Sequence, residues 1–316
     1  DSHNLCGALE FAEKISKIGT QPIIGSQINF LTNGVTGKLP IFAATEVGYK
    51  NLIKLSSKSY LDSGEKNEIC CDIADFQKLN QDLIVLSGNH FGLFGKLFKL
   101  NKTKQIEETS KFLKNIFDDK FYFEIQRHKE AGEESFENYL IQLSNKIEVP
   151  ILATQEVYYL KQDLYEAHDA LTCIGSKSYV DDVNRIKFSN QHYIKKNNDL
   201  IELYKDIPEA LENNYNFPYR FNFKPKKSIP ILPSISTDKN TSVEQELLSQ
   251  AKQGLKNRLD NFVFKKEKKI NRDKTIKIYN DRLTHEINII NSMDYPSYFL
   301  IVSDYIRWSK KNNIPV

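Results

Sequence analysis

The sequence predicts an α/β protein with a mainly parallel sheet and a separate helical extension. Short apolar runs alternate with helical patterns over residues 1–154. Prolines cluster between residues 217 and 233, and only helical periodicity follows them. At roughly 150 residues per domain, the 316 residues correspond to about two domains.

The expected strands are short apolar runs, which are typical of strands buried on both faces. These runs are residues 21–25, 39–45, 83–88, 121–125 and 150–154. Helical patterns lie between them, at residues 8–18, 48–56, 103–117 and 135–147. Strands that alternate with helices favour a parallel sheet, either closed into a barrel or doubly wound. In both arrangements, catalytic side chains would gather at the carboxyl ends of the strands.

The pattern changes after residue 216, where frequent prolines favour an extended connector. Ser242 and Gln245 have the spacing of a capping box that begins a helix. The apolar stripe of this helix is Leu247, Leu248, Ala251, Leu255, Leu259 and Phe262. A second helix carries Tyr279, Leu283, Ile287 and Ile290. We therefore place a domain boundary near residue 230.

Charge and composition restrict the partners. The 44 Lys and Arg residues nearly balance the 41 Asp and Glu residues, so affinity for nucleic acid would need a local patch. The candidate patch is a lysine run formed by Lys265, Lys266, Lys268 and Lys269, although such runs are usually solvated linkers. No apolar run reaches the roughly 18 residues of a membrane span, and the four cysteines form no C-x-x-C pair. We expect a cytoplasmic protein without membrane contact.

Common catalytic motifs are missing. None of the six histidines lies in an H-x-H or H-E-x-x-H pattern. His168 is the most suggestive, because Glu166 and Asp169 flank it, but neighbouring helical residues point about 100° apart and cannot chelate one ion. Glycine-rich phosphate loops and nucleophile elbows do not occur either. The residues alone indicate an α/β protein with a helical extension.

Several stretches, in order, resemble the family of bacterial DNA polymerase III alpha subunits. They include Asp1-Ser2-His3-Asn4-Leu5-Cys6-Gly7, Pro22-Ile23-Ile24-Gly25, Gly48-Tyr49-Lys50-Asn51-Leu52, Leu86-Ser87-Gly88, Glu166-Ala167-His168-Asp169, Asp206-Ile207-Pro208-Glu209-Ala210-Leu211 and residues 295–308. The resemblance implies a PHP (polymerase and histidinol phosphatase) domain over residues 1–230, which would be a distorted βα barrel without its first strand. Residues 231–316 would be connector helices and the beginning of the polymerase palm.

The resemblance also implies an activity that this fragment would not perform alone. The intact chain would be a DNA-directed DNA polymerase that adds dNTPs to a primer 3′ end on a template, with Mg²⁺ as cofactor. The family's catalytic aspartates would lie beyond Val316, so we expect no catalytic residue within residues 1–316. The implied partners are primer-template DNA, the proofreading exonuclease subunit epsilon on the PHP domain, and the sliding clamp and other holoenzyme subunits on a C-terminal part outside this fragment.

The metal-ligand positions of the PHP family are altered here. The positions that the resemblance aligns with these ligands carry Ser2, Gln27, Lys38, Asn89, Glu156 and Tyr158. In the metal-binding members most of them carry histidine, cysteine or a carboxylate. The ammonium group of Lys38 would repel divalent cations, or would replace one of them. We therefore predict a barrel without metal that serves as a scaffold.

Two alternatives stay open. A stand-alone PHP phosphoesterase would need an intact metal site, and it would leave residues 295–308 unexplained. A non-catalytic remnant of a split gene would keep only the fold or a partner surface.

Overall fold

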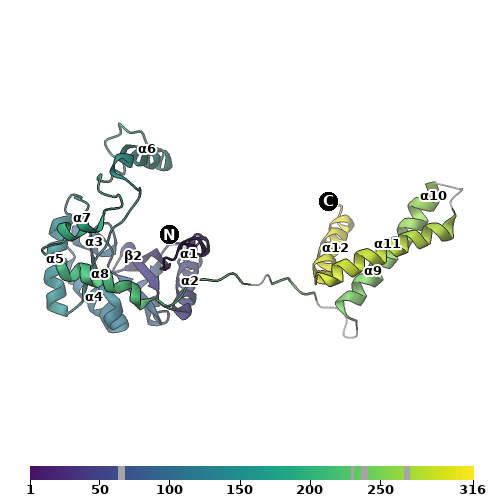
Figure 1. The fold of residues 1–316 in the computed structure, drawn as a ribbon, viewed down its shortest axis with the longest axis horizontal. Helices are drawn as coiled ribbons and strands as arrows, with labels where there is room; N and C mark the ends of the chain where they lie inside the picture. The colour runs from purple at the N-terminus through teal and green to yellow at the C-terminus, as the bar shows by residue number, and fades with distance from the viewer. Residues whose placement is uncertain (63–67, 229–230, 236–240, 267–270) are drawn as a thin grey trace. The chain divides into compact units, whose positions relative to one another are not determined.

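The computed structural model describes residues 1–62, 68–228, 231–235, 241–266 and 271–316. The chain divides into two compact units, Asp1–Lys227 and Ser228–Val316 (Figure 1). The first unit is a mixed α/β domain and the second is helical, which confirms the predicted fold class.

The sheet of the first unit contains both parallel and antiparallel pairs. Its strands are β1 (Gly25–Thr32), β2 (Val35–Ala43), β3 (Cys71–Asp72), β4 (Leu83–Leu86), β5 (Phe121–Ile125) and β6 (Ile151–Ala153), in the order β3-β1-β2-β4-β5-β6. Strand β2 is antiparallel to both of its neighbours, whereas the other pairs are parallel. Among the described strands, three of the five pairs are thus parallel, which agrees with the prediction of a mainly parallel sheet. The prediction did not include the antiparallel pairs of β2, which forms a hairpin with β1.

The hairpin turn explains this difference. Asn33 and Gly34 connect β1 to β2 with positive φ angles of 48° and 76°. Two central residues with positive φ match the twist of the flanking strands, and Asn-Gly is the pair that adopts this turn most readily. In the described part of the chain, the strand pairing runs from β3 to β6 and does not close into the predicted barrel.

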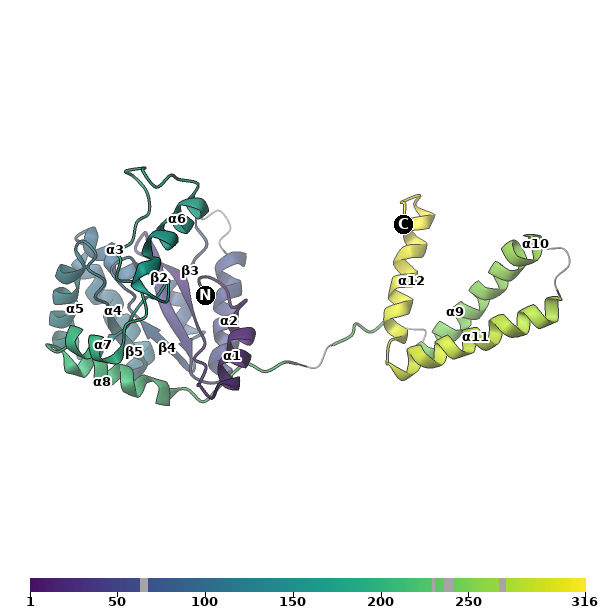
Figure 2. The ribbon, with the colours of Figure 1, turned by 45° about the horizontal axis from the view of Figure 1, so that its top comes forward.

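Figure 2 shows the helices of the first unit arranged around its sheet. They are α1 (Ala8–Lys17), α2 (Glu46–Leu61), α3 (Leu93–Lys99), α4 (Thr103–Phe117), α5 (Glu133–Ile147), α6 (Tyr165–Ser176), α7 (Asn197–Leu203) and α8 (Pro208–Asn216). The four predicted helical patterns correspond to α1, α2, α4 and α5. Figure 1 shows α6 standing away from the rest of this unit.

The sheet has two different faces because side chains alternate along each strand. On the first face, strand residues such as Phe30, Ile41 and Phe123 pack with α2, α4 and α5 in the main core. On the second face, a smaller cluster covers only part of the surface: Ala44, Ile84, Leu86, Tyr122, Leu152, Phe217 and Phe221. Polar side chains, among them Gln27, Glu124 and Gln126, occupy another part of the second face, and this part is the location of the candidate site.

The second unit is formed by α9 (Val243–Arg258), a π-helical turn (Leu259–Val263), α10 (Phe264–Lys266), α11 (Arg272–Ser292) and α12 (Pro296–Lys311). The predicted capping box is present, since the N–H of Gln245 donates to Oγ of Ser242 and the N–H of Ser242 donates to Oε1 of Gln245, both at 3.3 Å. Leu247, Ile287 and Leu300 form the core. Phe262 and Tyr279, predicted on the apolar stripes, are instead 62% and 43% exposed.

Candidate functional site

The candidate site is a polar surface at the carboxyl ends of β4, β5 and β6. Glu124 and Gln126 point to the second sheet face, because Phe123 and Ile125 occupy the first. Asn89 follows β4, and Glu156 follows β6. Two cavities of about 590 Å³ each adjoin here, and both are lined by Gln27, Pro40, Glu124, Glu156 and Tyr158.

Amide side chains connect the two carboxylates of this surface. Glu156 accepts hydrogen bonds from Nε2 of Gln27 at 3.3 Å and from Nδ2 of Asn89 at 2.8 Å. Asn89 also donates to Oε1 of Gln126 at 3.1 Å, and Nε2 of Gln126 donates to Oε1 of Glu124 at 3.0 Å. Three of the substituted ligand positions, Gln27, Asn89 and Glu156, thus lie in one hydrogen-bonded network.

Glu124 is the buried end of this network. The hydroxyl of Thr154 donates to Oε1 of Glu124 at 2.5 Å, whereas Oε2 is buried and has no hydrogen-bond partner among the described residues. Burial raises the pKa of Glu124 to about 7, since hydrogen bonds from Thr154 and Gln126 only partly offset it, and the charge of Glu156 raises the pKa further. The carboxyl group of Glu124 therefore titrates near neutral pH.

Lys38 and Ser2 lie at one side of the site. Nζ of Lys38 is 3.5 Å from Oγ of Ser2, at the limit of a hydrogen bond. The N-terminal segment runs parallel to β1, with the N–H of His3 donating to the carbonyl of Gln27 at 2.8 Å. Ser2 lines one of the two cavities, and His3 lines neither. Burial, with a smaller effect of Lys38, lowers the pKa of His3.

Tyr158 belongs to a stack of aromatic rings. Its ring lies 5.1 Å from His168 and 4.8 Å from His192, and His192 stacks on His128 at 4.0 Å. Burial raises the pKa of Tyr158 far above its usual range, so the phenol stays protonated. The stack connects α6 to the end of β5. It also gives His168 a packing role.

The described residues contain no grouping of three or more His, Cys, Asp or Glu side chains that could hold a metal ion.

Asp169, which flanks His168 in the sequence, forms a bidentate ion pair with Arg185 at 2.6 and 2.7 Å. This pair lowers the pKa of Asp169. The carboxylate is thus directed to a guanidinium rather than to the imidazole.

The lysine run predicted as a DNA contact lies only partly within the described residues. Lys265 and Lys266 lie in α10, where Nζ of Lys265 donates to Oδ1 of Asn261 at 3.3 Å. Lys268 and Lys269 lie outside the described residues.

Within the described ranges, no helix has the length and apolar character needed to cross a membrane.

Sequence reasoning missed Glu124, Gln126 and Thr154, although all three lie in or next to predicted strands. A carboxylate and an amide, two positions apart in the run Phe-Tyr-Phe-Glu-Ile-Gln, were the available signal. Side chains two positions apart on a strand lie on the same face of the sheet, so Glu124 and Gln126 lie on one face. The pattern therefore indicates a polar surface at the end of this strand.

Comparison with known families agrees with this architecture. Residues 1–128 match the PHP domain family, and residues 245–316 match the family described as the bacterial DNA polymerase III alpha NTPase domain. Residues 1–128 of the first unit are therefore similar to PHP domains, and we call this unit the PHP-type domain.

Relatives over the whole chain define the family more closely. The chain is 38% identical to the DNA polymerase III subunit alpha of Rickettsia bellii over 320 residues, covering 100% of the chain and 27% of the relative. The chain is 36% identical to the same subunit of Caulobacter vibrioides, covering 100% of the chain and 28% of the relative. It is 33% identical to the same subunit of Vibrio cholerae, covering 100% of the chain and 27% of the relative. The chain is thus homologous along its full length to bacterial DNA polymerase III alpha subunits. It spans about a quarter of the length of these relatives.

Proposed function

We propose that the chain is part of a replicative DNA polymerase, whose complete form adds dNTPs to a primer 3′ end on a DNA template in the bacterial cytoplasm. The observation that supports this proposal most is the similarity of both units, in order, to one kind of protein. Nucleotidyl transfer needs Mg²⁺ ions held by carboxylates. We propose that these carboxylates belong to a part of the complete protein outside residues 1–316.

Primer extension tests this proposal. The complete protein should extend a primer on a template with Mg²⁺ and dNTPs, whereas residues 1–316 alone should not, because they would lack the metal-binding carboxylates. Extension is measured on a labelled primer in a denaturing gel. Template-dependent extension by residues 1–316 would show that the catalytic groups lie within them.

We also propose that the PHP-type domain is a scaffold without a resident metal. The amide groups of Gln27 and Asn89 direct N–H donors at Glu156, which occupies carboxylate oxygens that a metal would need. Lys38 adds a positive charge at the side of the same site. The arrangement satisfies a carboxylate with donors instead of a cation.

Metal analysis of the purified chain checks this scaffold role. We expect substoichiometric zinc, manganese and iron, and no hydrolysis of p-nitrophenyl phosphate when these metals are added, because the substituted positions supply too few ligands. Stoichiometric metal together with phosphate release would instead support a stand-alone phosphoesterase.

The docking role of the PHP-type domain follows from the same proposal. We propose that it holds the proofreading exonuclease subunit epsilon, and that the sliding clamp and other holoenzyme subunits bind elsewhere on the complete protein. Homology to a polymerase subunit supports the existence of such partners.

The lysine run is a proposed contact with DNA phosphates. In the complete polymerase, replacing Lys265, Lys266, Lys268 and Lys269 with glutamine should weaken DNA binding for all sequences. Each lost phosphate contact should flatten the logarithmic salt dependence of the binding constant by about 0.9 on duplex DNA. Titrations at several salt concentrations measure this slope. An unchanged slope would identify the run as a solvated linker.

A further inference from the structure

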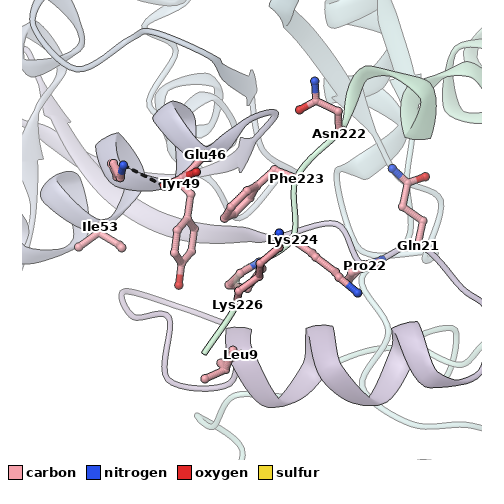
Figure 3. A pocket seen from close by; sticks show the side chains of 12 residues that line it. Leu9, Gln21, Pro22, Glu46, Tyr49, Ile53, Asn222, Phe223, Lys224 and Lys226 are labelled. Carbon is pink, nitrogen blue, oxygen red and sulfur yellow. Dashed lines mark ion pairs between the residues drawn. The ribbon is translucent and has the colours of Figure 1, made fainter. Parts of the chain in front are cut away.

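A groove of about 950 Å³ lies in the first unit, away from the substituted metal-ligand positions (Figure 3). It is bounded by α1, α2 and the extended residues 222–226. Leu9, Ile53 and the rings of Tyr49 and Phe223 supply its apolar lining, and the two ring centroids are 5.1 Å apart. Figure 3 shows these two rings side by side. The groove therefore offers aromatic and aliphatic surface to a ligand.

Residues 222–226 cross this part of the unit as an extended chain with a contact at each end. The N–H of Asn222 donates to the carbonyl of Ala44 at 3.1 Å. At the other end, Nζ of Lys227 forms an ion pair with Oε1 of Glu13 in α1 at 3.0 Å. The main-chain bond of Asn222, the burial of Pro225 and the packing of Phe223 on Tyr49 hold the segment, which is not a strand of the sheet.

Between these anchors, the main chain of residues 223–226 makes no hydrogen bond to any described residue. Phe223 is half-buried and Pro225 is buried, whereas Lys224 and Lys226 are exposed. This alternation is that of a strand with one face packed and one face in solvent. Pro225 has no main-chain N–H, so the free donors of this segment are the N–H groups of its other residues, and every C=O group is a free acceptor. An extended segment of this kind is an edge along which a second extended chain can form main-chain hydrogen bonds.

The charges at the rim restrict what that chain can be. Lys224 and Lys226 form no ion pair within 4 Å with a described residue, although the charge of Lys226 contributes to the lowered pKa of Glu46. Glu46, the one carboxylate among the described residues that line the groove, is already paired with Lys50 at 2.9 Å. The unpaired charges of the rim are therefore positive.

We propose that this groove binds an extended, acidic peptide segment of a partner protein. An apolar or aromatic side chain of the peptide fills the space beside Tyr49 and Ile53, and its acidic residues lie next to Lys224 and Lys226. A single-stranded nucleic acid would use the lysines and the rings, but it would leave the main-chain edge unpaired, so the peptide fits better. The inference rests on the docking role proposed above, for which it names the surface and the chemistry of the partner.

Fluorescence anisotropy with the full chain tests the groove. The probe is a labelled synthetic peptide in which aspartate alternates with leucine and phenylalanine. We expect it to bind, and we expect Lys224→Glu combined with Lys226→Glu to weaken binding by roughly tenfold or more, because both reversals place like charges together. Lys78→Glu combined with Lys161→Glu is the matched control, since both lysines are exposed, form no ion pair with a described residue and line none of the groove. Tyr49→Ser should also weaken binding, and circular dichroism checks that each variant is folded.

Three outcomes would overturn the inference. They are no binding of the acidic peptide, equal weakening by the two charge-reversal pairs, and tighter binding of an oligo-dT strand or of the same peptide with lysine in place of aspartate. Primer extension by the complete polymerase should be unchanged by the Lys224 and Lys226 variants. Failure of the peptide to bind would thus overturn the groove inference and leave the polymerase proposal to its own test.

Discussion

Glu124→Gln should stabilise the first unit above pH 7 and have little effect near pH 5. The carboxyl group of Glu124 has its pKa raised from 4.5 to about 7, chiefly by burial. Between these values the folded state binds more protons than the unfolded state, so the free energy of unfolding falls as the pH rises through this window. A pKa shift of this size contributes roughly 3 kcal/mol to the free energy of unfolding at low pH, and this contribution is lost by about pH 7. Glutamine is neutral at every pH and accepts the same hydrogen bonds from Thr154 and Gln126, so it removes this loss.

Urea denaturation between pH 5 and pH 8 measures the effect. Circular dichroism follows the whole chain, and the emission of Trp308, the single tryptophan, reports on the second unit. Glu212→Gln, at an exposed position in α8, is the matched control and should leave the pH dependence unchanged. A Glu124→Gln variant that is less stable than the unchanged protein at pH 8 would contradict the prediction.

The sequence predicted buried elements better than the half-buried hairpin. Residues 121–125 and 103–117 were expected as a strand and a helix, and they coincide with β5 and α4. By contrast, the first strand was expected at residues 21–25, whereas β1 occupies Gly25–Thr32. Its residues alternate between buried and half-buried, so they do not form an apolar run. The alternation together with Asn33-Gly34 was the available signal.

The site was predictable only in part, for a physical reason. The resemblance identified Gln27, Asn89 and Glu156, which the fold brings together. The hydrogen bond between Gln27 and Glu156 joins residues 129 positions apart, and no local pattern specifies it. The same holds for the stacking of Tyr158 on His168, which depends on where α6 packs. Side chains that depend on long-range packing cannot be paired from spacing alone.

Arg127 holds together three elements that support the site. Its guanidinium donates to both carboxylate oxygens of Glu137 in α5, to the carbonyl of Leu203 and to Asp206. It also lies over the ring of Tyr204, 4.8 Å from the centroid. The Arg127 and Glu137 side chains are only 20% and 10% exposed, so water screens this pair weakly. Arg127 directly follows Gln126 of the site, and its contacts therefore fix the end of β5.

Arg127→Leu should destabilise the first unit by roughly 3–5 kcal/mol, because it leaves the carboxylate of Glu137 buried without a cation. The exposed pair of Lys205 and Glu202 provides the matched control, and Lys205→Leu should cost less than about 1 kcal/mol. Combining Arg127→Leu with Glu137→Leu should recover much of the stability, because the double variant buries no unpaired charge. Urea denaturation of the four proteins measures these differences. If the double variant is as unstable as Arg127→Leu alone, the loss comes from packing around Tyr204 and not from the charge of Glu137.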